Sequence, residues 1–514
     1  MRIENSLKNM LFGISGQVIS AIMGFVVRTA FIYTLGIEYL GIDGLFSSIL
    51  MMLSLANLGF DSAIIYNLYK PLAEKDQYKI QALINLYQKA YRIIGIVILI
   101  IGLSLMPFLS YLMNGQTTIE HINIIYLLFL LNSVSSYFFV YKHSIIIADQ
   151  RNHIISKIHS VFIFISNLIQ IILLILVGNY ILVLITQVLF RIIENGYIAR
   201  KANNLYPFLK GKNNSKLTKL ERKAFFKDLY SLFLYKISGV VINGTDNIII
   251  SIFIGVTTVG IYSNYLLIIT TLTTFLGYIF YSITASVGNV IAKEGQEKKY
   301  FIFRVLNFSN FWIYGFFVVC LWNLINPFIT IWLGEQYVFN KYIVFAILVN
   351  FYTTGMQDAP TTFRDTTGLF NKGRYRPVIA VIINILFSII LANQIGIAGV
   401  IIGTVISRFC TYFWYDPYVI FKYVFNQSVK IYFLRYFQFT VLVFMSAIIT
   451  DAIGSLFFKD KLLLEIIVRI LICLIVPNFI FYLIFKGSVE FNYLLSILKA
   501  ITKKYTRKKV AEIA

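Results

Sequence analysis

The sequence predicts an all-α polytopic membrane protein with about 14 transmembrane helices. Of its 514 residues, 58% are hydrophobic, 17% are aromatic and only 13% are charged, and the mean hydropathy is +0.77. Apolar stretches of the roughly 20 residues that a membrane helix needs recur from Met10 to Phe485 with short interruptions. A water-soluble chain could not bury this much apolar surface.

Apolar runs between charged or turn-rich breaks define fourteen spans, with centres near residues 22, 55, 102, 130, 166, 190, 241, 274, 314, 351, 385, 408, 443 and 473. If the N-terminus is cytoplasmic, 37 of the 45 basic residues fall in inside segments, three in outside connections and five within spans. Basic residues concentrate on the cytoplasmic side, so both termini are predicted to lie there. The net charge of +22 is then a signal of topology rather than of nucleic-acid binding.

A weak internal repeat divides the chain into two halves. Residues 36–42 (GIEYLGI) correspond to residues 255–261 (GVTTVGI) at an offset of 219, and Arg191 corresponds to Arg408 at an offset of 217. Each match falls at the same place in a six-span unit. Because six is an even number, the halves share one orientation and form parallel pseudo-repeats.

The repeat predicts two six-helix lobes plus two extra C-terminal helices. The predicted parts are an N-terminal lobe at 1–200, a basic cytoplasmic linker at 201–227, a C-terminal lobe at 228–421, two additional transmembrane helices at 422–486 and a basic cytoplasmic tail at 487–514. The tail is expected to lie on the anionic inner leaflet, and docking of polysaccharide assembly enzymes is a second hypothesis for it.

Two lobes joined by short outer connections favour a transporter over an enzyme, with a binding site between the lobes near the bilayer midplane. The most extensive outer connection, at 326–341, has about fifteen residues, too few for a catalytic domain. The three cysteines and four histidines show no metal-ligand spacing. The sequence therefore predicts no metal site and no cofactor.

Several cations lie within predicted spans, where a charge costs about 2.5 to 3.5 kcal/mol at the bilayer centre. Arg28 and Arg408 have no carboxylate at helical spacing in their own spans, so they rank highest as cavity cations. Arg191 has Glu194 three residues on, so an ion pair and a substrate contact remain equal alternatives. Lys236 can line the cavity or extend to the interface.

An excess of cations in a cavity predicts an anionic substrate, and arginine suits phosphate because its planar fork forms paired hydrogen bonds. Asp61 and Asp246 could neutralise the empty cavity, or bind a proton or Na⁺ that drives return of the carrier. Arg469, with Glu465 one turn before it, is predicted to form a structural pair outside the duplicated core.

Two blocks of sequence carry a family resemblance. The first is RTAFIYTLGIEYLGIDGLF at 28–46, continuing through LSLANLG at 53–59 and LYKPLA at 68–73. The second is RDTTGLFNKGRYRP at 364–377, followed by GIAGVIIGT at 396–404. These blocks resemble the bacterial polysaccharide (oligosaccharide repeat-unit) flippases of the multidrug, oligosaccharidyl-lipid and polysaccharide exporter superfamily, and the likeness extends over essentially the whole chain.

The resemblance implies a flippase of the bacterial plasma membrane that acts in surface or capsular polysaccharide synthesis. It would move oligosaccharide units on undecaprenyl pyrophosphate from the cytoplasmic to the outer leaflet, by alternating access of two lobes around the cavity. Arg28 would meet the pyrophosphate, and Arg408, Arg191 and Lys236 would line the cavity.

Two alternatives stay open. One is a cation-coupled exporter of another substrate, in which carboxylates rather than arginines would dominate the cavity. The other is a membrane-embedded transferase or polymerase of lipid-linked sugars, which needs an acid/base or metal-binding pair at one membrane surface. The nearest candidate pairs for such an enzyme are Asp149 with His153 and Asp358 with Asp365, which also fit polar helix ends.

Overall fold

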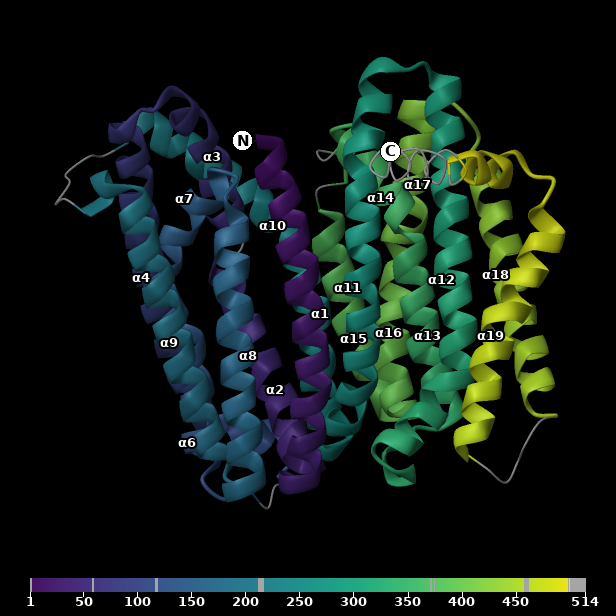
Figure 1. Ribbon diagram of the computed structural model, residues 1–514, viewed down its shortest axis with the longest axis horizontal. Coiled ribbons are helices and arrows are strands. Elements are labelled where there is room, and N and C mark those ends of the chain that lie inside the picture. The colour runs from purple at the N-terminus through teal and green to yellow at the C-terminus, as the bar shows by residue number, and fades with distance from the viewer. Residues whose placement is uncertain are drawn as a thin grey trace, which may run out of the picture. The chain divides into compact units, whose positions relative to one another are not determined.

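The computed structural model is built from helices, and the residues it describes contain no strand (Figure 1). It describes residues 2–57, 60–115, 119–210, 217–369, 372–373, 375–456, 462–497 and 499. Part of the predicted linker and nearly all of the basic run of the predicted tail therefore lie outside the described residues.

The chain is a multi-pass membrane protein. Within the described residues, eleven helical segments are long and apolar enough to cross a membrane: Ser15–Leu35, Gln77–Leu112, Ile122–Ala148, Asn152–Val177, Tyr180–Leu205, Val256–Phe280, Gln296–Trp332, Arg376–Ile395, Ile397–Phe425, Lys430–Gly454 and Leu464–Phe485. Each contains one of the predicted span centres. The remaining three centres, near 55, 241 and 351, fall where the helices are interrupted or their apolar part is short.

The span predicted near residue 351 is divided between two consecutive helices. Helix α13 (Lys341–Met356) ends at Gln357, and α14 (Asp358–Thr366) begins directly after it. Asn340 starts α13 by accepting a hydrogen bond from the Ile343 amide at 3.0 Å, which satisfies one donor of the first turn. The sixteen residues of α13 are too few to cross a bilayer alone.

The chain forms two compact units, and each contains segments from distant parts of the sequence. Unit 1 consists of Met1–Leu267 and Ser388–Val400, and unit 2 consists of Ile268–Phe387 and Ile401–Ala514. Helix α11 (Val256–Lys293) contributes its beginning to unit 1 and the remainder to unit 2. The predicted boundaries of the lobes and linker stay a prediction.

Unit 1 is made mostly of the first ten α-helices and the four short 3₁₀ helices between them. Their bounds are α1 (Arg2–Leu35), α2 (Ile37–Leu53), η1 (Ser54–Asn57), α3 (Phe60–Glu74), α4 (Gln77–Leu105), η2 (Met106–Phe108), α5 (Leu109–Leu112), α6 (Ile122–Tyr137), η3 (Val140–Lys142), α7 (His143–Ala148), α8 (Asn152–Val177), α9 (Tyr180–Leu205), η4 (Pro207–Lys210) and α10 (Lys219–Phe253). Helix α1 packs along α8, α9 packs against α6 and α8, and α2 packs against α10.

The repeated glycines meet in unit 1. Gly36 and Gly255 both have positive φ, +88° and +126°, which glycine adopts without steric cost, and each precedes a helix. Five residues later, a Cβ on Gly41 would lie 2.0 Å from the Val256 carbonyl oxygen, and one on Gly260 would lie 2.4 Å from the Ile37 carbonyl oxygen. The start of α2 and the start of α11 therefore pack backbone to backbone, each through the same position of the repeat.

Unit 2 is arranged around α12 (Gln296–Trp332). Its other elements are η5 (Glu335–Tyr337), α13, α14, parts of α15 (Arg376–Ile395) and α16 (Ile397–Cys410), α17 (Tyr412–Ile420), the π-helical turn η7 (Phe421–Phe425), α18 (Lys430–Gly454) and α19 (Leu462–Phe485). Helices α13, α18 and α19 pack against α12, as Figure 1 shows at the yellow-green end of the chain.

Aromatic rings fill the core of unit 2. The Phe311 ring stacks on Phe439 with centroids 4.1 Å apart and contacts Phe481 and Phe485. A second group, around Phe303, joins Phe363, Phe421, Phe425 and Tyr432. Such ring pairs add to the packing energy beyond area burial, so the two groups join α12 to α14, η7, α18 and α19.

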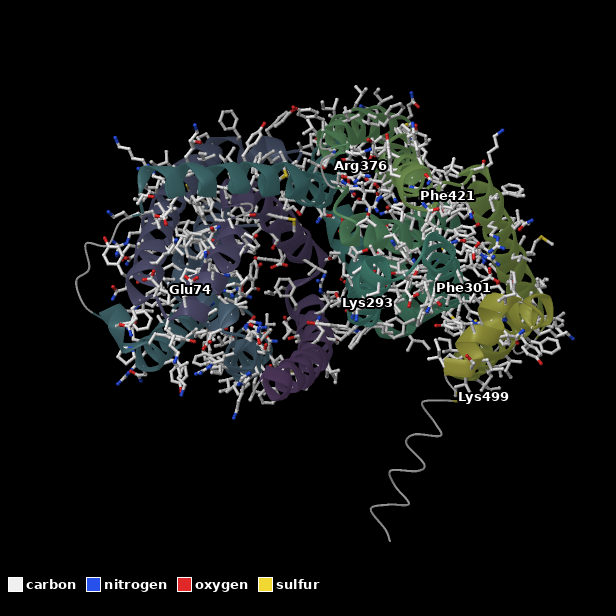
Figure 2. All side chains as sticks on the ribbon, turned by 90° about the horizontal axis from the view of Figure 1, so that it is seen from above. Glu74, Lys293, Phe301, Arg376, Phe421 and Lys499 are labelled. Carbon is white, nitrogen blue, oxygen red and sulfur yellow. The ribbon has the colours of Figure 1, made fainter. Side chains whose placement is uncertain are left out.

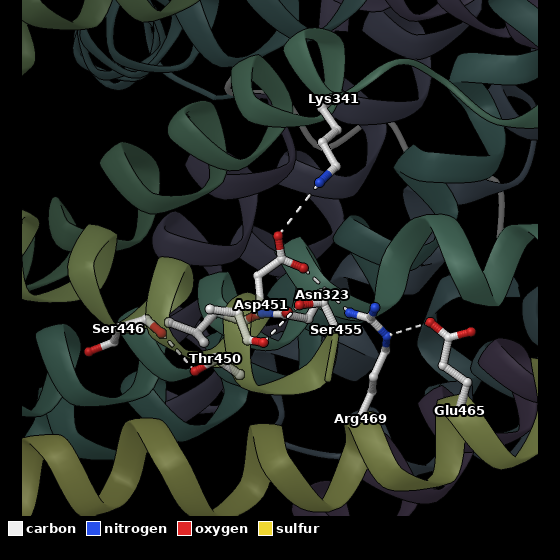
Figure 3. A network of polar contacts seen from close by, with 10 residues as sticks. Asn323, Lys341, Ser446, Thr450, Asp451, Ser455, Glu465 and Arg469 are labelled. Atoms are coloured by element: carbon white, nitrogen blue, oxygen red, sulfur yellow. Dashed lines mark hydrogen bonds and ion pairs between the residues drawn. The ribbon is translucent and has the colours of Figure 1, made fainter. Parts of the chain in front are cut away.

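The pair predicted between Arg469 and Glu465 is present, and it belongs to a larger network (Figure 3). The Arg469 Nε donates to Glu465 Oε1 at 2.9 Å, and its NH1 reaches Asp451 Oδ1 at 3.4 Å. Lys341 Nζ lies 3.5 Å from the other oxygen of Asp451. This network joins α13, α18 and α19, so Arg469 is held in structural contacts.

Candidate functional site

Unit 1 contains a polar cavity of about 560 Å³, a volume typical of ligand sites. We call it the unit 1 cavity. Residues of α2, α6, α8 and α9 form most of its wall: Asp43, Ser47, Leu50, Phe129, Asn132, Ser133, Ser136, Val140, His143, Ile155, His159, Gln187, Arg191, Glu194 and Asn195. Most of these side chains carry hydrogen-bonding groups, so the cavity fits a polar ligand.

Arg191 reaches this cavity from α9, and its guanidinium forms no hydrogen bond or ion pair with the described residues. The predicted alternative of an Arg191–Glu194 pair is wrong. Glu194 instead accepts from His159 Nδ1 at 2.8 Å, across from α9 to α8. Spacing along one helix could not reveal this contact, because His159 lies 35 positions from Glu194 in the sequence. Arg191 thus remains available to an anion.

A chain of amides continues the polar wall between α8 and α9. Gln187 donates to the side-chain oxygen of Gln170 at 2.9 Å, and Gln170 donates to Ser166 Oγ at 2.9 Å. Gln187 and Gln170, together with Arg191, also border a smaller adjoining cavity of about 180 Å³. These bonds fix the orientation of the amides, so their remaining donors and acceptors are positioned before any ligand arrives.

Arg28 lies on α1 in a second polar cluster of unit 1. Its NH1 donates to Ser263 Oγ at 2.6 Å, and its charge interacts with that of Asp43 on α2. Asp43 accepts a hydrogen bond from the Tyr180 hydroxyl at 3.0 Å and also lines the unit 1 cavity. The charge of Arg28 is therefore influenced by a carboxylate of another helix, and the same carboxylate, Asp43, lines the cavity that contains Arg191.

Unit 2 repeats this combination with residues of different helices. The carboxylate of Asp358 interacts electrostatically with Arg408 and accepts a hydrogen bond from the Tyr314 hydroxyl at 2.7 Å. The Tyr314 ring packs directly against Gly355, where a Cβ would lie only 2.1 Å from the ring. The absence of a side chain at Gly355 therefore leaves room for this ring. Arg408, like Arg28, thus finds its carboxylate outside its own helix.

A buried cluster lies near the start of α15 in unit 2. Asp416, which is fully buried, forms ion pairs with Arg364 at 3.4 Å and with Arg376. Gln357 donates to the second oxygen of Asp416 at 3.1 Å. Two guanidiniums share this one carboxylate, and Arg376 also lies over the Tyr412 ring at 4.2 Å. Both arginines lie within the family block at 364–377, but the sequence of that block does not indicate Asp416 as their partner.

The other predicted site residues have separate places. Asp246 is buried on α10 and interacts electrostatically with Tyr262 of α11. Lys236 lies on α10 and Asp61 on α3, but their side chains lie outside the described residues. A common cavity for Arg28, Arg191, Arg408 and Lys236, and ion coupling by Asp61 and Asp246, stay predictions.

The residues suggested for an enzymatic pair have structural partners. Asp149 forms an ion pair with Arg151 at 2.9 Å and accepts from the Tyr206 hydroxyl at 2.7 Å, and Asp358 is held by Tyr314. No group of three or more potential metal ligands occurs in the described segments.

Sequence reasoning missed Asp43, Tyr180, the Glu194–His159 pair and Asp416. An ionisable residue inside an apolar helix indicates a functional or paired group. Asp43, within the block at 28–46, is such a residue and could have been found in this way. The tyrosines gave no such signal, because 35 tyrosines occur along the chain.

Comparisons with known proteins identify the fold through structure alone. No protein-family model and no curated protein sequence matches the chain. Among solved structures, it is similar to the lipid II flippase MurJ in an inward closed conformation, with a TM-score of 0.62, 18% identity, and coverage of 93% of this chain and 99% of that one.

Two multidrug transporters give similar matches. An inward-facing MATE family transporter of the MOP superfamily has a TM-score of 0.61 and 13% identity, with 80% of this chain and 98% of that one covered. The MATE multidrug transporter DinF-BH has a TM-score of 0.57 and 16% identity, with 83% and 96% covered. The chain therefore has the fold that these flippase and MATE transporter structures share.

Proposed function

We propose that the protein is a flippase that moves undecaprenyl-pyrophosphate-linked oligosaccharide units from the cytoplasmic to the outer leaflet of the bacterial plasma membrane. The observation that carries this proposal is the polar unit 1 cavity, with Arg191 in its wall, in a chain whose fold covers 99% of a lipid II flippase. The sequence resemblance to repeat-unit flippases supports the same substrate class.

The chemistry of the cavity suits a sugar carried on phosphate. Hydroxyl and amide side chains such as Asn132, Ser136 and Gln187 can exchange hydrogen bonds with sugar hydroxyls. Arg191 can form paired, charge-assisted hydrogen bonds with an anionic group. In this proposal the polyprenyl chain stays in the bilayer, and rocking between two states exposes the cavity to one leaflet at a time.

The test is transport in a bacterial strain that makes the native lipid-linked repeat unit and lacks its own flippase. Arg191→Ala removes the cavity cation without leaving a protein group unpaired, because no described residue bonds to it. A charge-assisted hydrogen bond contributes about 1.5 to 3 kcal/mol, so transport should fall about tenfold to a hundredfold. Surface polysaccharide and lipid-linked units stranded inside are measured together.

The matched control is Arg200→Ala, which removes the same charge from an exposed position of α9 outside the cavity lining. It should transport like the wild type at equal expression. Failure of the wild-type protein with its native unit would reject the function, whereas full activity of Arg191→Ala would keep the function and reject this site.

A second candidate is a cation-coupled exporter of another substrate, favoured by the two carboxylates, Asp43 and Glu194, in the wall of the same cavity. In that case Asp43→Asn should abolish ion-driven export of a cationic dye, and the wild type should not restore surface polysaccharide. A flippase predicts the opposite result in the polysaccharide assay.

A further inference from the structure

Unit 2 has a cavity of its own, about 380 Å³ in volume, at the start of α15. We call it the α15 pocket. It is lined by Gly373, Tyr375, Arg376, Ile379, Cys410, Thr411, Trp414 and Tyr415. One cation and three aromatic side chains that bear polar groups thus share a small apolar pocket, and none of these residues lines the unit 1 cavity.

The cation of this pocket is built into the fold. Arg376 is 7% exposed and pairs with Asp416, which also serves Arg364. Two buried guanidiniums thus share one buried carboxylate, and this pairing is what allows Arg376 to be buried with its charge. Arg376, labelled on the green part of the ribbon in Figure 2, is one of the residues that line the pocket, so an anion in the pocket would meet it.

The turn before α15 shapes the opening. Gly373 has a φ of +77°, and a Cβ there would lie 2.3 Å from the Tyr415 ring. Only glycine therefore allows this turn to close against Tyr415. The positive end of the α15 dipole, at Arg376, adds to the local field that favours an anion.

The pocket lies at one end of an apolar helix. The apolar segment of α15 begins at Arg376 and has 20 residues, about the length that crosses the hydrocarbon core, so we expect this end of the helix near the lipid headgroups. Tyr375 and Trp414 are about half exposed there, and such aromatic residues gather at membrane interfaces.

An exposed apolar stripe continues from the pocket along α15. Ile379, Ile382 and Leu386 are all exposed, and their spacing of three and four residues places them on one face of the helix. Such an apolar face on a helix long enough to cross a membrane is a suitable surface for an acyl chain. A lipid with its headgroup in the pocket could therefore lay its chain along this stripe.

We propose that the α15 pocket binds the phosphate of a membrane lipid, with Arg376 contacting the phosphate and Trp414, Tyr375 and Tyr415 surrounding the headgroup. The lipid is a phospholipid of the surrounding bilayer with a net negative charge, or a polyprenyl phosphate, since both present the same phosphate on an apolar chain. This site is independent of the proposed transport function and of the unit 1 cavity.

The test uses the full-length protein, delipidated in detergent and analysed by native mass spectrometry after addition of a defined lipid. Phosphatidylglycerol and undecaprenyl phosphate are the two anionic probes, and phosphatidylcholine is the zwitterionic control. At least one anionic lipid should be retained about tenfold or more over phosphatidylcholine. Whichever of the two is retained identifies the source of the phosphate.

Two variants locate the lipid. Arg376→Ala should abolish retention, and Cys410→Trp should do so without touching the buried ion pairs, because Cys410 is exposed and lines the pocket. The matched control, Leu434→Trp, adds similar bulk at an exposed position of α18 outside the pocket. Each variant is first checked for a wild-type melting profile, and Cys410→Trp decides the result if Arg376→Ala does not fold.

Retention of phosphatidylcholine equal to that of both anionic lipids would overturn the proposal. Unchanged retention in folded Cys410→Trp would overturn it as well. Displacement of the lipid by inorganic phosphate at equal molar concentration would also contradict it, because the apolar stripe would then add nothing to binding.

Discussion

The two units use the same three residue types in different surroundings. In unit 1, Asp43 is held by Tyr180, interacts with Arg28 and borders a cavity of about 560 Å³. The polar group is thus placed where a ligand can reach it.

In unit 2, the corresponding carboxylate is Asp358, held by Tyr314 near Arg408. Both tyrosines are buried among aromatic rings: Tyr314 contacts Phe280 and Phe351, and Tyr180 contacts Phe31 and Phe129. What differs is that Asp43 borders the unit 1 cavity. The comparison teaches that an adjoining cavity, rather than the Arg–Asp–Tyr combination itself, decides whether the charged group can serve a ligand.

The substitution with the largest expected effect, Asp416→Ala, tests whether the charges of unit 2 stabilise the fold. Asp416→Ala would leave Arg364 and Arg376 buried without their shared carboxylate, which should cost about 3 to 5 kcal/mol of stability. Folded yield and melting temperature in detergent measure this loss. Glu335→Ala, at an exposed position of the same unit, should leave both unchanged, and a stable Asp416→Ala protein would remove the structural role from this cluster.

A second substitution tests whether unit 1 is tightly packed away from its cavity. Gly260→Ala places a Cβ against the Ile37 carbonyl oxygen, and such overpacking should cost about 1 to 3 kcal/mol. Gly277→Ala on the same helix meets nothing within 4 Å, so it should melt at or above the wild-type temperature. Equal melting of the two variants would mean that α2 and α11 can separate at little cost.

The tyrosines provide the sharpest comparison of the two units. Tyr314→Phe deprives the half-buried Asp358 of a hydrogen bond, which should cost about 1 to 3 kcal/mol. Tyr180→Phe should cost less, since water in the adjoining cavity can replace the lost donor at Asp43. Thermal unfolding of both variants measures the difference, and a larger loss for Tyr180→Phe would contradict the comparison.

The smallest expected effect depends on pH. Glu490 lies beyond α19, where burial opposes its ionisation, but hydrogen bonds from Arg435 at 2.6 Å, from the backbone and from Arg304 at 2.7 Å outweigh burial and lower its pKa below 4.5. A carboxyl with a lowered folded-state pKa stabilises the fold above its unfolded pKa and loses this contribution as the pH falls through the folded value.

Acidification below about pH 4.5 should therefore release residues 489–497 from α12 and α18. Hydrogen exchange of this segment, measured across that pH range, detects the release. Glu490→Gln should exchange faster already at neutral pH and lose most of the pH dependence. A pH-independent wild-type segment would show that the two ion pairs do not hold it.

Much of the architecture could be predicted because a bilayer imposes a simple rule. Apolar runs must become helices when the backbone has no water to bond, so the eleven membrane-crossing segments matched predicted spans. The pair of Arg469 with Glu465 was also predictable, because neighbours four residues apart share one helix face. Partners from other helices followed no such rule, so the sequence offered only Arg191 as a partner for Glu194, as one of two equal alternatives, and did not indicate His159.

The sequence by itself determined that this is a helical membrane protein, where its apolar runs lie, and which charges need a partner within them. Only the tertiary structure decided which partner each charge has, because that depends on which helix faces lie together. It placed Asp43 and Arg191 at one cavity and paired Asp416 with two arginines. Spacing of about 3.6 residues per turn fixes neighbours along one helix, whereas contacts between helices join positions whose separation in the chain is unrestricted.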